Sequence, residues 1–299
     1  MYLIDVDVQT PVASAGRWRL YGIGDPHLDK ATHDRRALTR YIKHIASDPH
    51  GLPICVGDVF DVTLPGHKFF DASTQRRDVV AMMDRYLNKM IEEAVDVFAP
   101  IMEAGRPLII AEGNHDVRLH GVNAVQMLCT MLNARAKERG WSGVAHYAGG
   151  EALIRVRALD APTGKGKGIA GGTIYTVYLA HGTGGGMQPG GKVNRATWQT
   201  HIADADVYLR GHVEEADIRI VDRYRLPSKG ALRLVTRPVA YYTAAGYGTR
   251  RRAGVVDYAG RKSLPPVDRR IQWLEIQTPR GGTDSRGHGG RMWAREPQW

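Results

Sequence analysis

Three short apolar runs in the first 116 residues, each closed by a polar cluster beside a glycine, limit the folds open to this chain. The runs are RWRLYGIGD (17–25), LPICVGD (52–58) and RPLIIAEGNHD (106–116). Their length and apolar content predict buried β-strands. Because ligand sites in open α/β sheets form at the carboxyl ends of strands, the three clusters are expected to meet at one edge of a sheet.

Amphipathic stretches between and after these runs predict helices. Apolar residues recur at helical spacing in residues 32–48, 72–104 and 123–140, with Thr32 as an N-cap and Gly140 ending the last helix. This order of strands and helices is typical of an α/β protein with a largely parallel sheet. The second half is richer in strand patterns, found at residues 152–159, 173–180, 206–210, 217–225 and 231–243.

Composition narrows the class of protein. With 299 residues, 43% of them hydrophobic and 24% charged, the chain can bury a sizeable core. It lacks an apolar run of about 18 residues, so no membrane span is expected. The N-terminal stretch does not resemble a secretory signal, which favours a cytoplasmic protein. The two cysteines, Cys55 and Cys129, lie in apolar runs and are expected to be buried thiols.

The positive charge is concentrated near the C-terminus. Residues 1–216 carry 24 Lys and Arg against 24 Asp and Glu, whereas residues 217–299 carry 17 against 7. Two interpretations remain open: a solvated basic face, or a surface that contacts nucleic-acid phosphates. Residues 1–279 are interpreted as one domain, and the Gly- and Arg-rich residues 280–299, which show no periodicity, as a mobile tail.

Metal-ligand side chains follow five of the predicted strands. In chain order the clusters are Asp25 and His27; Asp58 with Asp61; Asn114, His115 and Asp116; His181; and His212 with Glu214. Mixed Asp, His and Asn ligands suit borderline divalent metals such as Mn²⁺, Fe²⁺ or Zn²⁺. Five clusters offer too many ligands for one ion, but two ions about 3.5–4 Å apart would use them.

The ordered series GDPHLD, GDVFD, GNHD, HG and GHVE resembles the calcineurin-like metallophosphoesterase superfamily. That family has the pattern D-x-H, G-D-x-x-D, G-N-H-[DE], H and G-H-x-H, which this chain follows in order from about residue 19 to residue 214. The resemblance implies two packed mixed β-sheets flanked by helices, in four layers. It also implies a hydrolase in which a hydroxide that bridges two metal ions attacks a phosphoester.

The resemblance also assigns roles to individual residues. Asp25 and His27 would bind the first metal, Asp58 would bridge both, and Asn114, His181 and His212 would bind the second. His115 would face the substrate phosphate with Asp116 orienting it, and Asp61 would hold a ligand in position. Mn²⁺ is the expected metal, with Fe, Zn, Mg and Ni as alternatives.

Glu214 is the one departure from the family pattern, because it stands where a second histidine is usual. Three interpretations are open: it binds the first metal through oxygen, it holds a metal-bound water, or it is solvated. Three further residues are candidates for substrate binding. His120 either lines the cleft or is an ordinary packed histidine, and Lys192 and Arg195 lie in a Gly-rich stretch after His181.

The expected function is therefore metal-dependent phosphoester hydrolysis. The basic third favours a phosphodiesterase or nuclease that acts on DNA, RNA or nucleotides. A phosphomonoesterase acting on proteins or small molecules is the enzymatic alternative. A nucleic-acid-binding protein that kept the fold without catalysis is the alternative of another class. The oligomeric state does not follow from the sequence.

Overall fold

Strand β1 (Tyr2–Thr10) shows how alternating side chains build the sheets of this protein. Ile4, Val6 and Val8 are buried, whereas Asp5 and Asp7 between them are exposed. Since successive side chains of a strand point to opposite faces, this alternation buries one face and leaves the other to water. β1 is an addition to the strands that were predicted.

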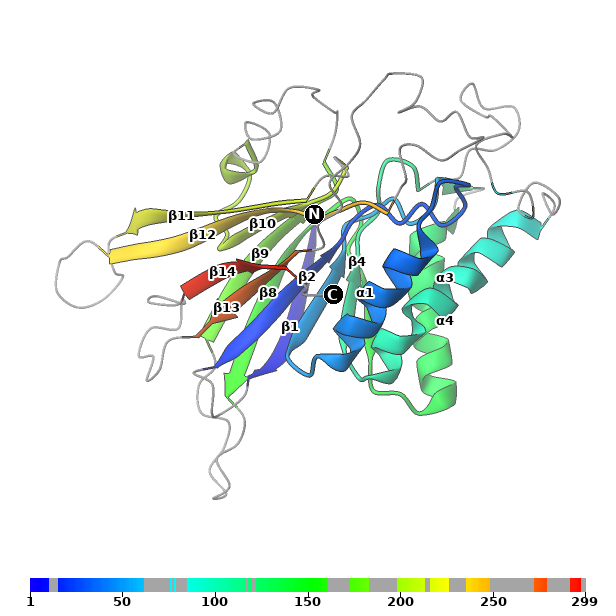
Figure 1. Cartoon of the computed structure of the whole chain (residues 1–299), viewed down its shortest axis with the longest axis horizontal. Coiled ribbons are helices and arrows are strands. Elements are labelled where there is room, and N and C mark those ends of the chain that lie inside the picture. Colours follow the sequence, from blue (N-terminus) through cyan, green and yellow to red (C-terminus); the bar gives the residue numbers. More distant parts are fainter. Residues whose placement is uncertain are drawn as a thin grey trace.

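The structure is a computed structural model that describes residues 1–10, 16–61, 76, 78, 85–116, 118–119, 122–160, 173–182, 198–212, 216–225, 235–247, 272–278 and 291–296. Within these ranges the chain forms an α/β fold with two six-stranded mixed sheets and three α-helices. Figure 1 shows the helices gathered on one side of the paired sheets. The predicted α/β class with two mixed sheets is confirmed.

The first sheet is covered by the helices, and we call it the helix-covered sheet. Its strand order is β14 (Arg291–Arg295), β13 (Trp273–Gln277), β2 (Arg17–Ile23), β3 (Gly51–Cys55), β4 (Pro107–Ile110) and β7 (Val144–Tyr147). β2, β3, β4 and β7 are parallel, as predicted for the first three, so their carboxyl ends lie at one edge. β13 and β14 extend the sheet in antiparallel pairing.

The second sheet contains the strands predicted in the second half of the chain. Its order is β1, β8 (Glu151–Asp160), β9 (Thr173–Ala180), β10 (Val207–Arg210), β12 (Val235–Thr243) and β11 (Asp217–Arg225). β9 and β12 both run parallel to β10, which lies between them. The carboxyl ends of β9 and β10 therefore lie side by side. A separate antiparallel pair is formed by β5 (Arg118–Leu119) and β6 (Val122–Asn123).

Two apolar cores hold the layers together. One lies between the sheets and contains side chains such as Trp18, Leu20, Ile54, Ile154 and Val177. The other lies between the helix-covered sheet and its helices. Burial of one such side chain stabilises the folded chain by about 1.5–3 kcal/mol. The stacked layers are therefore held in fixed positions relative to one another. Both cysteines are buried and free, as expected.

The helices begin and end close to the predicted positions. Helix α1 (Arg35–Ser47) has Asp34 as its N-cap instead of Thr32, because the Asp34 carboxylate accepts from the Ala37 backbone N–H at 3.0 Å. Helix α4 (Ala124–Arg139) ends at Gly140, which has the left-handed conformation that was expected. Helix α3 (Tyr86–Glu103) forms the second part of the predicted helix at 72–104.

The C-terminal segment differs from its prediction. Residues 291–295, which were expected to belong to a mobile tail, form the edge strand β14, and Met292 packs into the core between the sheets. The strand is only five residues long, which is short for a clear alternation of apolar and polar residues. It also follows a Gly-rich sequence, which does not indicate a strand. The interpretation of residues 280–299 as a tail is therefore wrong for β14.

The opposite face of the second sheet carries a smaller apolar cluster. Tyr178, Tyr208 and Tyr241 are buried there, and Ala203 packs against them after the 3₁₀ turn η4 (Gln199–His201). None of the helices α1, α3 and α4 belongs to this cluster. Among the described residues, no helix combines the length and the apolar character that crossing a membrane requires.

Candidate metal centre

Polar side chains gather at the edge where the carboxyl ends of both sheets meet. In the helix-covered sheet Asp25 follows β2, Asp58 follows β3 and Asn114 follows β4. In the second sheet His181 follows β9 and His212 follows β10. Contacts among these side chains show that the structure brings the five predicted clusters together.

The backbone is strained where it presents these side chains. φ is 27° at Asp25, 43° at His27, 50° at Asp58 and 68° at His212. In the described part of the chain no other non-glycine residue has a positive φ. Such conformations cost roughly 1–3 kcal/mol each and are typical of functional sites. All four were predicted as metal ligands from the sequence.

Two glycines allow the loops after β3 and β4 to touch. Gly57 has φ of 104°, and a Cβ there would lie 2.5 Å from the backbone nitrogen of Gly113. A Cβ on Gly113 would lie 2.0 Å from Asp58 Oδ1. Only glycine fits such close approaches. The glycines before Asp58 and Asn114 therefore set the position of both ligands.

Asp58 lies in the middle of the cluster and is almost fully buried. Its Oδ2 is 3.1 Å from His181 Nε2 and 3.9 Å from His27 Nε2. Its Oδ1 accepts the backbone N–H of His115 at 2.8 Å. The carboxylate thus stands between the histidine of the first cluster and that of the fourth, which is where a ligand shared by two ions has to be.

Asn114, His181 and His212 converge on one point. Asn114 Oδ1 lies 3.0 Å from His181 Nε2 and 2.8 Å from His212 Nδ1. The Nδ1 of His181 lies 2.8 Å from the carbonyl oxygen of Val56, which leaves Nε2 to face the cluster. Ligand atoms of Asp58, His181 and His212 all lie within 4.8 Å of one another. Three donors at such separations are suited to hold one cation.

Asp25 and His27, from the loop after β2, also lie in this cluster. Asp25 Oδ1 accepts the backbone N–H of His212 at 3.2 Å and lies 3.9 Å from His181 Nδ1. The His27 backbone N–H donates to the carbonyl oxygen of Asp58 at 2.9 Å. These contacts tie the loop after β2 to the loops after β3 and β10, so both sheets contribute to one site.

The partner of His115 is not the one predicted. Asp61 Oδ1 lies 2.7 Å from His115 Nδ1. Asp116 instead accepts the backbone N–H groups of Phe60 at 3.1 Å and Gly113 at 2.7 Å. Asp116 therefore braces two loops, and Asp61 orients His115. The carboxylate three residues after Asp58 reaches the histidine, whereas the neighbour of the histidine points away from it.

Two residues that were not predicted complete the surroundings of Asp61. The Lys30 ammonium lies 3.0 Å from Asp61 Oδ1. The buried Asp29 accepts the Asp61 backbone N–H at 2.6 Å, and its other oxygen accepts the hydroxyl of Tyr86 on α3. Asp29 and Lys30 follow shortly after His27 in the motif GDPHLDK, where a turn brings them back to the same site. Their position in this motif was the sequence feature that could have identified them.

The carboxylates of the site differ in their tendency to ionise. Burial alone would raise the pKa of Asp58, but a hydrogen bond with His181 and the nearby histidine charges hold it well below its usual range. Asp61 has a lowered pKa for the same kind of reason, since His115 and Lys30 outweigh its burial. Burial and the charge of Asp58 raise the pKa of Asp116 to about 7. The lowered pKa values of Asp58 and Asp61 favour their ionised forms, which cation binding requires.

The histidines respond to the same charges. Burial and the nearby Lys30 lower the pKa of His27 to about 3. Burial also lowers the pKa of His212, to which the charge of His181 adds. Against its burial, the pKa of His181 is raised to about 9 by Asp58 and Asp25. A cluster that favours a proton on His181 stabilises positive charge at that place, which a metal ion would also supply.

The residues present fit a divalent cation. The donors are carboxylate and amide oxygens with imidazole nitrogens, a set suited to Mn²⁺, Fe²⁺ or Zn²⁺. Among the described residues, His27 Nδ1 is a buried nitrogen without a hydrogen-bond partner, and Asp61 Oδ1 is 3.7 Å away. Asp25, His27, Asp58 and His181 are all less than 5% exposed, so their polar atoms need compensation from inside the site.

Four predicted residues lie outside the part of the chain that the structure describes. They are Glu214, His120, Lys192 and Arg195. The question of whether Glu214 binds the first metal therefore stays as the sequence posed it. Comparison of the chain with family models, curated proteins and solved structures finds no match.

Proposed function

We propose that this chain is a metal-dependent phosphoester hydrolase that acts on phosphodiesters of nucleic acid or nucleotides. The observation that carries the proposal is the convergence of Asp25, His27, Asp58, Asn114, His181 and His212 at one sheet edge, next to His115. The resemblance of the motif series to calcineurin-like metallophosphoesterases supports the same reaction. In the proposal, Asp25, His27 and Asp58 hold one ion and Asp58, Asn114, His181 and His212 hold a second.

The metal ions, when bound, would supply positive charge that polarises the phosphoryl group and activates water near neutral pH. The chain itself has to place these charges at fixed positions. The strained backbone at Asp25, His27, Asp58 and His212 supports this role, because it holds ligand atoms without further rearrangement. A preorganised set of charges is the main source of rate acceleration in such reactions.

His115 is proposed to donate a proton to the leaving oxygen. Its side chain is 40% exposed, in contrast to the buried ligands around it. Asp61 lies at Nδ1, so Nε2 is the nitrogen that holds the proton for the leaving oxygen. The pKa of His115 is raised above its usual value because the hydrogen bond to Asp61 and the charge of Asp58 outweigh burial. A protonated imidazole is the form that this step needs.

The charge distribution supports a nucleic-acid or nucleotide substrate. The last 83 residues carry an excess of ten positive charges, and most of that charge is arginine, whose planar fork binds phosphate oxygens. In addition, Lys30 places an ammonium group beside Asp61 and His115. A substrate with several phosphates binds more tightly when cations also lie near the phosphates that do not react.

We further propose the four-layer arrangement of the family, with a second helical layer over the free face of the second sheet. The buried cluster of Tyr178, Tyr208 and Tyr241 with Ala203 supports it, because aromatic side chains on that face are already covered. The described residues there form only the short turn η4.

A substrate panel tests the function. The purified chain with Mn²⁺ would be offered bis-p-nitrophenyl phosphate, p-nitrophenyl phosphate, and single- and double-stranded DNA. We expect turnover of the diester and of DNA. Cleavage of the monoester alone would instead indicate a phosphomonoesterase. Absence of turnover with Mn²⁺, Fe²⁺, Zn²⁺, Mg²⁺ and Ni²⁺, together with salt-sensitive DNA binding, would indicate a binding protein and refute the hydrolase.

A further inference from the structure

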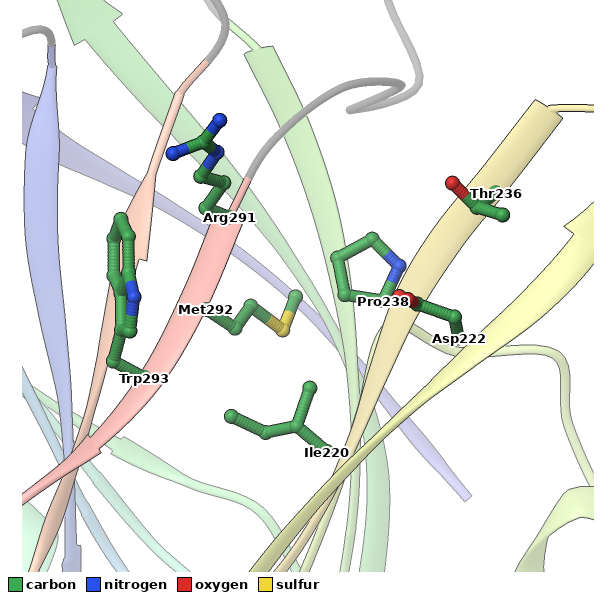
Figure 2. Close-up of a pocket in the computed structure, with 7 residues that line it drawn as sticks. All are labelled: Ile220, Asp222, Thr236, Pro238, Arg291, Met292 and Trp293. Atoms are coloured by element: carbon green, nitrogen blue, oxygen red, sulfur yellow. The ribbon is translucent and has the colours of Figure 1, made fainter.

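A cavity of about 450 Å³ opens between β14 on one side and β11 and β12 on the other (Figure 2). It lies toward the start of β12, whereas the residues after β12 adjoin the metal centre, since Ala245 accepts the Gly24 N–H. The lining of the cavity includes the carboxylate of Asp222, which disfavours a phosphate there. The contacts that extend the metal centre lie instead between the loop after β2 and helix α3.

One carboxylate oxygen, Oδ1 of Asp61, lies close to the nitrogens of three side chains. His115 Nδ1 is 2.7 Å from it, Lys30 Nζ is 3.0 Å away and His27 Nδ1 is 3.7 Å away. An imidazole whose Nδ1 faces a fixed acceptor has its Nε2 on the opposite side. The position of this carboxylate therefore sets the direction in which Nε2 of His115 points.

Asp29 fixes the position of Asp61. It is fully buried, and its Oδ1 accepts the Asp61 backbone N–H at 2.6 Å. Its Oδ2 accepts the hydroxyl of Tyr86, the first residue of α3. A buried carboxylate destabilises the folded chain unless donors replace the lost water, and here each of its oxygens has one. Asp29 is thereby held between the helix and the loop that carries Asp61.

Helix α3 supports this contact because it is anchored in the core. Met90, about one turn after Tyr86, is fully buried between the helix-covered sheet and its helices. A second contact joins the same helix to the loop after β2. Arg76 donates to the carbonyl oxygen of Leu28 at 3.2 Å and to the carboxylate of Glu93 in α3 at 2.7 Å. Two contacts therefore hold this loop against α3.

We propose that Tyr86 is a positioning residue that acts on His115. It does so through the contacts of Asp29 and Asp61, which fix the direction of the imidazole. The contact matters most for diesters whose leaving group is a sugar hydroxyl, as in DNA, RNA and dinucleotides. This role rests on the proposed function, in which His115 donates a proton to the leaving oxygen.

The step in which His115 takes part explains why the leaving group matters. The oxygen of a water molecule forms the new bond to phosphorus and gives up a proton to solvent. The bond from phosphorus to the sugar oxygen breaks, its electron pair stays on that oxygen, and the oxygen takes the proton from Nε2 of His115. A sugar alkoxide is strongly basic and needs this proton, whereas p-nitrophenolate spreads its charge over the ring and leaves without it.

The test compares kcat for the dinucleotide TpT with kcat for bis-p-nitrophenyl phosphate, both with Mn²⁺. Tyr86→Phe is expected to lower the ratio of the two values about tenfold, because the hydroxyl that holds Asp29 is lost. Tyr175→Phe is the matched control. It removes a buried tyrosine hydroxyl that contacts the carbonyl oxygen of Gln277 at 3.3 Å, and it should leave the ratio unchanged.

A second measurement does not depend on turnover. In the proton NMR spectrum of the metal-free chain, the Nδ1–H of His115 that faces Asp61 should give a signal downfield of the amide protons, identified by its loss in His115→Ala. We expect this signal to weaken in Tyr86→Phe, because a less fixed Asp61 lets the proton exchange with water. The signal should persist in Tyr175→Phe.

Several outcomes would overturn the proposal. A purely structural role of Tyr86 would lower kcat for both substrates by the same factor, so an unchanged ratio in Tyr86→Phe would do so. A His115 signal that is absent from the wild-type chain, or unchanged in Tyr86→Phe, would also do so. If Tyr86→Phe does not fold, Asp29→Asn decides, with a fall in the same ratio expected. Lack of turnover of both substrates by the wild-type chain would refute the hydrolase, and the NMR signal would still decide whether Tyr86 positions His115.

Discussion

Strand β3 and the loop after it contain two regions with opposite physical character. Leu52 and Ile54 are fully buried in the core between the sheets, in regular backbone with a parallel neighbour on each side. Only four residues after Ile54, Asp58 is equally buried but carries a charge and a φ of 50°. The first region lowers the free energy of the folded state, and the second raises it through strain and desolvation.

This difference separates the residues that hold the fold from those proposed to serve the reaction. In the described part of the chain, buried charged side chains with a positive φ occur only where the carboxyl ends of the two sheets meet. The core a few residues away contains none of them. Substitutions in the two regions should therefore have separable effects, on stability in one and on turnover in the other.

The largest effect is expected from Asp58→Asn. Asparagine tolerates the left-handed backbone, but it removes the charge that the two proposed ions would share. We expect hydrolysis of bis-p-nitrophenyl phosphate to fall by about a thousandfold or more, while cooperative thermal unfolding persists. Retained activity in steady-state assays with Mn²⁺ would contradict the role proposed for Asp58 and the contrast between the two regions.

His115→Ala is expected to have the next largest effect. Loss of a proton donor typically lowers kcat about 10²–10⁴-fold. Mn²⁺ affinity, measured by calorimetry, should stay close to that of the wild-type chain, because His115 is not among the proposed ligands. Loss of both metals in this variant would contradict the role given to His115.

Ile154→Ala tests the other region, in the middle of β8. The cavity left in the core should lower the free energy of unfolding by about 2–5 kcal/mol. At a temperature where the variant is still folded, kcat should match that of the wild-type chain. A large drop in kcat without a drop in stability would show that the core and the site are not separable. Denaturant titration with parallel assays measures both quantities.

Asp61→Asn and Asp116→Asn form a matched pair with smaller effects. Asp61→Asn disturbs the orientation of His115 and should lower kcat about 10–100-fold. Asp116→Asn loses one acceptor for the backbone N–H groups of Phe60 and Gly113, so unfolding should become easier by about 1–3 kcal/mol with kcat nearly unchanged. The reverse pattern would restore the role first predicted for Asp116.

The positions of the candidate ligands were predictable because strand ends and motif spacing act together. Strands that are parallel place their carboxyl ends at one edge, so Asp25, Asp58 and Asn114 had to lie close together. The orientation of single side chains was not predictable in this way. Asp116 is the sequence neighbour of His115, yet its carboxylate points to backbone amides, whereas Asp61 reaches the ring from another loop.

The fold also has elements that could be predicted from the sequence and elements that could not. Strands β9 and β11 and the end of α4 at Gly140 match the predicted bounds, because their patterns are long and their end signals local. β13 and β14 were not predicted: β13 pairs with the distant strand β2, and β14 follows a Gly- and Arg-rich stretch and pairs with β13 at the edge of the sheet. β1 was not predicted either, although Ile4, Val6 and Val8 alternate with polar residues in its sequence.

The number of Mn²⁺ ions bound per chain, determined by calorimetric titration of the metal-free protein, tests the central claim most directly. The account predicts two ions for the wild-type chain and weakened binding of both for Asp58→Asn, since that carboxylate is proposed to be shared. Binding of the same number of ions with unchanged affinity in Asp58→Asn, or no binding in the wild-type chain, would contradict it.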